Sequence, residues 1–191
     1  ARGRVLLQTN ATAPHAFHKY DNEGRNVTTG LFSSTTNLVV GTDDPTTETS
    51  NRLALTETAY DEVGQVWKTT RHKIDAADGS DDDTLTYLTW RDAAGRVIKE
   101  KGSQHSKTFY DRLGRTTQRF VLAEDNDTTY AHMSAIGGDT VLEEHQTVYE
   151  SEDSDDVVMS VRVDRAHDDF GGMSPTTGRL DTNADSDSLL V

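Results

Sequence analysis

The sequence predicts an all-β fold made of antiparallel hairpin repeats. Residues 157–164 alternate strictly, so that Val157, Met159, Val161 and Val163 share one face of a strand and polar residues share the other. Short Asp-x-x-Gly segments separate runs of this kind, and no long stretch carries an apolar stripe of helical period. Hairpins that follow one another in this way form a meander in which each strand pairs with the next.

The remaining strands are predicted from shorter runs rich in Thr, Val, Tyr and other residues that favour sheets. The three prolines of the chain lie near expected turns, as sheet geometry requires. The predicted strands are residues 52–60, 65–70, 84–90, 96–101, 107–110, 115–122 and 140–149.

Two kinds of turn alternate between these runs. In the first kind an Asp opens the turn, where its carboxylate accepts a backbone N–H, and a Gly closes it with a positive φ. Its members are Asp21–Gly24, Asp61–Gly64, Asp92–Gly95, Asp111–Gly114 and Asp168–Gly171. The second kind is polar and acidic, at residues 42–46, 78–83, 102–105, 124–128, 136–139 and 151–156. The alternation predicts that each kind lies at its own edge of the sheet.

Three turns of the first kind share a longer repeat. They read Tyr20-Asp21-Asn22-Glu23-Gly24-Arg25, Tyr60-Asp61-Glu62-Val63-Gly64-Gln65 and Tyr110-Asp111-Arg112-Leu113-Gly114-Arg115. A fourth copy, Arg91-Asp92-Ala93-Ala94-Gly95-Arg96, lacks only the Tyr, and residues 167–172 form a degenerate fifth copy. Three full copies exceed what chance matches to so short a pattern would give. The repeat is therefore a property of the fold.

These motifs resemble the YD repeat of the RHS-repeat family, whose pattern is Tyr-Asp-x-x-Gly-Arg followed by a short Thr-rich strand. The family includes bacterial polymorphic toxins, cocoon subunits of insecticidal toxin complexes, wall-associated proteins and teneurins. The resemblance covers about residues 15–180 and implies a long sheet that coils into a hollow shell, often around a toxin domain. It also implies an extracellular or cell-surface location. The motif glycines are more irregularly spaced than in the family, and no self-cleavage segment is visible around Asp44-Pro45.

Composition excludes several function classes. The formal charge of −14 argues against binding to nucleic acid or to an anionic membrane surface, because both need clustered Lys and Arg. No apolar run is long enough to span a bilayer. Cysteine is absent, so neither disulfides nor thiolate metal sites can form. With 33% hydrophobic residues and no evident closing element, residues 1–191 are interpreted as one run of repeats from a longer chain.

No catalytic, cofactor or metal site is predicted, and the chain is expected not to be an enzyme. The acidic segments 81–83 and 152–156 lack the spacing of known Ca²⁺ loops and are interpreted as solvated turns. His15 and His18 would face opposite sides of a strand, so they do not converge on one metal. Ser134, Ser160 and Ser174 have no nucleophile-elbow context.

The motif residues themselves allow two interpretations. The tyrosines either pack against the neighbouring hairpin or form a ladder on which glycans stack; we favour packing. Arg25, Arg96 and Arg115 are expected to pair with acidic groups on adjacent turns. The predicted function is a structural segment of a shell or fibre, with other repeats, an enclosed toxin domain or another copy of the chain as partners. The alternative is an adhesin module that binds a glycan or a protein.

Overall fold

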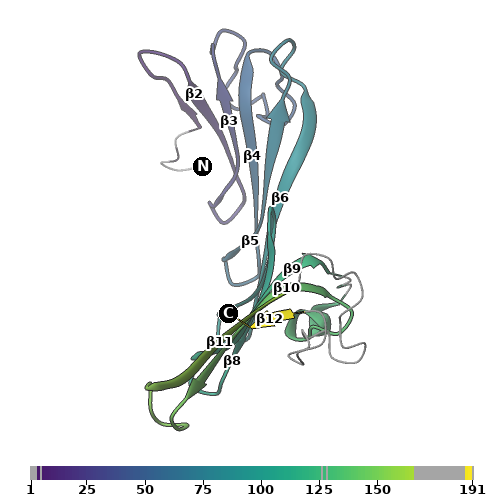
Figure 1. The fold of residues 1–191 in the computed structure, drawn as a ribbon. Helices are drawn as coiled ribbons and strands as arrows, with labels where there is room; N and C mark the ends of the chain where they lie inside the picture. Colours follow the sequence, from purple (N-terminus) through teal and green to yellow (C-terminus); the bar gives the residue numbers. More distant parts are fainter. Residues whose placement is uncertain (1–3, 5, 126, 128, 166–187, 191) are drawn as a thin grey trace. The chain divides into compact units, whose positions relative to one another are not determined.

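The computed structural model describes residues 4, 6–125, 127, 129–165 and 188–190, and within them the predicted all-β class is confirmed (Figure 1). The described residues contain no α-helix, and the only helical element is the short 3₁₀ segment η1, Tyr130–Ser134. None of them forms a helix long and apolar enough to cross a membrane. The chain divides into two compact units, residues 1–88 and 89–191.

Unit 1 is a meander in which each strand pairs antiparallel with the next. The structure confirms the predicted strand at residues 52–60 and adds two strands that flank the first motif turn but were not predicted. The strands are β1 (Leu7–Gln8), β2 (His15–Tyr20), β3 (Asn26–Phe32), β4 (Arg52–Tyr60), β5 (Val66–Ile74) and β6 (Asp81–Arg91), the last of which ends in unit 2.

Unit 2 continues the same antiparallel pattern. Its predicted strands are confirmed to within a few residues at each end. The strands are β7 (Val97–Lys101), β8 (His105–Tyr110), β9 (Thr116–Glu124), β10 (Thr140–Tyr149), β11 (Val157–Arg165) and β12 (Ser188–Leu190).

The two kinds of turn alternate within each unit, with two corrections. Residues 81–83, predicted as part of an acidic turn, instead begin strand β6, where Asp83 pairs with Lys73 and Asp81 with Ile74. Asp-x-x-Gly turns join β2 to β3, β4 to β5, β6 to β7 and β8 to β9. Segment 150–156 joins β10 to β11, which places it on the side of the Asp-x-x-Gly turns and not with the acidic loops as predicted. The N–H of Glu150 donates to the carbonyl of Asp156 at 2.8 Å, as the N–H of Asp111 does to Arg115 at 3.0 Å. Segment 150–156 is therefore an enlarged turn of the first kind.

A long connection covers the apolar face in unit 1. Phe17, Phe32 and Leu55 are buried on the sheet, and Pro45 of the connection at residues 33–51 is buried with them. Arg52 is only 3% exposed. Its Nε donates to the carbonyl of Gly79 at 2.9 Å, Nη1 to that of Thr46 at 3.2 Å and Nη2 to Asp81 at 2.7 Å. One guanidinium thus fixes two loops to the sheet.

A similar connection covers the sheet in unit 2. Ile136, from the segment at residues 125–139 that contains η1, packs with Phe120, Val141 and Val163 in the buried cluster. The predicted apolar face of β11 is only partly covered, since Val163 is 1% exposed but Val157 is 53% exposed. In each unit, a connection of the chain itself thus covers part of the sheet.

Candidate functional site: the motif ladder

Each motif turn is organised around its aspartate. In the turn after β8, Asp111 Oδ1 accepts the N–H groups of Leu113 and Arg115, both at 2.9 Å. Its Oδ2 accepts Nε of Arg115 at 2.6 Å. Burial disfavours the charged carboxylate, but the backbone N–H and guanidinium of Arg115 outweigh it and hold the pKa of Asp111 below its usual value. The aspartate therefore joins the start of the turn to its end.

The other described copies repeat this geometry. Nε of Arg25 donates to Asp21, and Nε of Arg96 donates to Asp92, each at 2.7 Å. Asp61 accepts the N–H of Gln65 at 2.8 Å but has no arginine in that position. As predicted, every glycine of these turns has a left-handed backbone: φ is 92° at Gly24, 84° at Gly64, 81° at Gly95 and 87° at Gly114. Asp168 and Gly171 lie outside the described residues.

A second set of contacts joins each turn to the next hairpin. The guanidinium carbon of Arg96 lies 4.6 Å from the ring centroid of Tyr110. The hydroxyl of Tyr110 donates to the carbonyl of Val97, the residue after the arginine, at 2.8 Å. Nη1 of Arg96 donates to the carbonyl of Asp111 at 3.3 Å. One arginine and one tyrosine thus make three different contacts between neighbouring hairpins.

The same contacts recur at two further steps. Arg25 lies 4.8 Å from the ring centroid of Tyr60, whose hydroxyl donates to the carbonyl of Asn26 at 2.9 Å. Arg115 lies 4.2 Å from the ring centroid of Tyr149, whose hydroxyl donates to the carbonyl of Thr116 at 3.1 Å. We call the arginine–tyrosine steps Arg4–Tyr20, Arg25–Tyr60, Arg96–Tyr110 and Arg115–Tyr149 the motif ladder; the first is described below.

The ladder gives the turn glycine a second role. A Cβ added to Gly114 would lie 3.1 Å from Nη1 of Arg96, the arginine of the preceding hairpin. At Gly64 the corresponding distance to Nη1 of Arg25 is 3.7 Å. The glycine therefore allows the turn to bend and also leaves room for the incoming guanidinium.

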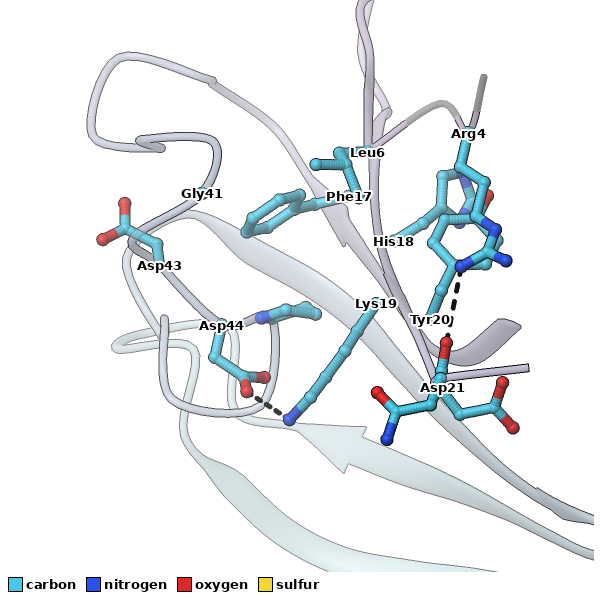
Figure 2. Close-up of a pocket in the computed structure, with 12 residues that line it drawn as sticks. Arg4, Leu6, Phe17, His18, Lys19, Tyr20, Asp21, Gly41, Asp43 and Asp44 are labelled. Atoms are coloured by element: carbon cyan, nitrogen blue, oxygen red, sulfur yellow. Dashed lines mark hydrogen bonds and ion pairs between the residues drawn. The ribbon is translucent and has the colours of Figure 1, made fainter. Parts of the chain in front are cut away.

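Two ladder residues were missed by the sequence analysis. Arg4 lies 5.7 Å from the ring centroid of Tyr20, and its Nη1 donates to the carbonyl of Asp21 at 3.4 Å (Figure 2). The signal is the pair Gly3-Arg4, which repeats the Gly-Arg end of the motif. Tyr149 was missed because Glu150 replaces the motif aspartate and the turn is enlarged.

The structure also corrects the predicted pairing of the arginines. Each pairs mainly with the aspartate of its own turn, because the two ends of a tight turn lie closer together than two neighbouring turns. The contact of Arg115 with Asp155 in the next turn is long, at 3.8 Å. Towards the next hairpin the guanidinium instead meets an aromatic ring and backbone carbonyls. Gln65 and Arg91 depart from the pattern, since they stand where the motif has Arg and Tyr.

A groove lies beside the first ladder step. The groove beside β2 is lined by Phe17, the ion pair of Lys19 and Asp44, and the first ladder step (Figure 2). His18 lines it as well, and burial lowers its pKa, which favours the neutral ring. Among the described residues, no group of three or more His, Cys, Asp and Glu side chains could hold a metal ion.

The similarities to known proteins lie among solved structures. No family model and no curated protein matches the sequence. A solved structure that matches is the crystal structure of TcdB2-TccC3-Cdc42, with 14% sequence identity and a TM-score of 0.39. The match covers 93% of this chain and 9% of that chain. At this identity and TM-score, the likeness carries no argument about activity or partners.

Proposed function

We propose that the chain is a structural segment of a secreted or cell-surface YD-repeat protein. Its hairpins form part of a β-shell that encloses cargo or of an extended fibre. The observation that supports this function is the motif ladder. Tyr, Asp, Gly and Arg of the motif are all used to close a turn or to join one hairpin to the next.

The ladder argues against glycan binding through the motif tyrosines. A sugar stacks on the free face of an aromatic ring, and the guanidiniums of Arg25, Arg96 and Arg115 already lie over the ladder rings. The hydroxyls of Tyr60, Tyr110 and Tyr149 are used as well, since each donates to a backbone carbonyl. These tyrosines therefore hold neighbouring hairpins together.

A structural role also fits the way in which the contacts are distributed. Each ladder step joins hairpins that are consecutive in the sequence, which is how repeat proteins accumulate stability along their length. We propose that the segment has no catalytic activity and that its partners are other repeats of the same polypeptide, an enclosed toxin domain or another copy of the chain.

Electron microscopy of the full-length parent protein, combined with limited proteolysis, tests this function. A hollow particle that protects an internal segment from protease supports the shell, and an elongated particle supports the fibre. Ladder variants such as Arg96→Gln should expose the protected segment or shorten the fibre, whereas Arg112→Gln, at an exposed ion pair of the next motif turn, should not. Specific binding to a glycan array that survives ladder disruption would instead support an adhesin module.

A further inference from the structure

Unit 2 contains a buried cluster of charged residues that the motif ladder does not use. Lys99 of β7 and Lys107 of β8 are direct neighbours in the sheet register. Their side chains are 1% and 0% exposed. Burying two ammonium groups side by side is costly unless carboxylates and hydrogen bonds compensate. We call these lysines and the aspartates around them, Asp125, Asp127 and Asp139, the lysine–aspartate cluster.

The aspartates come from the connection that covers the sheet. Asp125 Oδ1 lies 2.9 Å from Nζ of Lys99, and a carboxylate oxygen of Asp127 lies 2.8 Å from Nζ of Lys107 and also contacts Lys99. Asp139 Oδ2 lies 2.5 Å from Nζ of Lys107. The same Nζ donates to the carbonyls of His132 at 3.0 Å and Ala135 at 2.5 Å. Lys107 is therefore fixed against the carboxyl group of Asp139.

Asp139 differs from the other two aspartates. Its residue is fully buried, whereas Asp125 and Asp127 are partly exposed. Oδ1 of Asp139, like Oδ2 of Asp125, has no hydrogen-bond partner among the described residues. Desolvation raises the pKa of Asp139 despite the nearby Lys107, whereas Lys99 and Lys101 hold the pKa of Asp125 below its usual value in spite of desolvation. Desolvation thus shifts Asp139 towards its neutral form, which is the form of a carboxyl group that an amine can attack.

We propose that Lys107 and Asp139 form an intramolecular amide bond between Nζ and Cγ. The two side chains are in contact and excluded from water, and Asp127 lies beside the amine as a proton acceptor. A chain without cysteine has no disulfide as an alternative cross-link.

The reaction balances without any external reactant. The carboxylate of Asp127 takes a proton from the ammonium of Lys107, and the free amine attacks Cγ of protonated Asp139. Asp127 then donates its proton to the departing hydroxyl and accepts one from the nitrogen. The Nζ–Cγ bond forms, the Cγ–O bond breaks, and one water leaves. The proton that Asp127 takes from the nitrogen stays on its carboxyl group and is the net proton released.

Proximity favours this condensation. Effective molarities of well-oriented groups reach about 10⁵ M or more, which lowers the barrier to their condensation. The product would close a loop from β8 to the start of β10 and fix the covering segment to the sheet.

Mass spectrometry of the denatured chain tests the proposal. We expect an intact mass about 18 Da below that calculated from the sequence, the loss of one water, and a protease-derived peptide pair linked through Lys107 and Asp139. Lys107→Arg and Asp139→Ala should each restore the full mass. Asp127→Asn keeps the shape of the site but removes the proton acceptor, so it should also restore the mass.

Controls separate the amide from other dehydrations. Lys19→Arg, at an exposed ion pair, should keep the lower mass. A lower mass that persists in Lys107→Arg, or that hydroxylamine abolishes, would identify a backbone succinimide and overturn the proposal. A wild-type chain of full mass that is folded by circular dichroism would show that Lys107 and Asp139 form only an ion pair, which also overturns it.

Discussion

The guanidinium of Arg96 lies over the ring of Tyr110, while the tyrosine hydroxyl donates to the carbonyl of the residue that follows the arginine. The two residues belong to consecutive hairpins, so this arrangement fixes both their spacing and their register. The hydroxyl reaches past the arginine to the backbone. A phenylalanine at position 110 would therefore keep the contact between ring and guanidinium but lose the hydrogen bond to the carbonyl of Val97.

Replacing Tyr110 with Phe isolates the hydrogen bond from the cation–π contact. The change leaves the carbonyl of Val97 without this donor and should lower the free energy of unfolding by about 0.5–1.5 kcal/mol. Urea denaturation measures the loss. Arg112→Ala, at an exposed ion pair in the same turn, should change stability by less than about 0.5 kcal/mol. Equal effects of the two variants would contradict the ladder.

Replacing Gly114 with Ala combines two costs. The backbone has a φ of 87°, and the new Cβ would lie 3.1 Å from Nη1 of Arg96. Gly41→Ala is the matched control, since φ there is 91° and an added Cβ meets nothing within 4 Å. The positive φ alone should cost about 1 kcal/mol. We expect Gly114→Ala to cost measurably more in thermal unfolding. An equal loss in both variants would mean that Arg96 moves away freely.

Acid should weaken the motif turns. The pKa of Asp111 lies below its usual value in the folded chain and is about 3.9 in the unfolded chain. Between these two pKa values the folded state therefore binds fewer protons than the unfolded state. Its stabilising effect is complete above about pH 3.9 and is lost as the pH falls through the folded pKa. Asp111→Asn removes this contribution. Denaturation at a series of pH values should show a steeper acid loss for wild type than for the variant.

Arg52 should be essential to the covering connection of unit 1. Replacing it with Met keeps the apolar stem but removes the donors for Gly79, Thr46 and Asp81, which should cost about 2–4 kcal/mol. Limited proteolysis should then cut within residues 33–51 much faster than in wild type. Lys73→Met, at an exposed ion pair with Asp82, is the control and should leave the cleavage rate unchanged.

The sequence predicted local features well and long-range contacts poorly. Alternating residues and the Asp-x-x-Gly spacing are sufficient for the strands, the turns and the positive φ of Gly114, because each depends on residues close together in the chain. The partner of Arg96 could not be predicted in this way, since Tyr110 becomes its neighbour only when two hairpins pair. The burial of Lys107 was the hardest feature to predict. A lysine in a strand is expected to be exposed, and this one is buried because the covering segment lies over it.

The ladder has a consequence for how the scaffold can be altered. Its contacts all lie on the side of the motif turns, whereas the opposite connections range from the short segment 102–104 to the long segment 33–51. The length of a connection on that side therefore does not affect how the hairpins align through the ladder. A foreign peptide grafted at residues 102–104 should be displayed without shifting the strands, which would make this connection a natural insertion point for epitopes or probes.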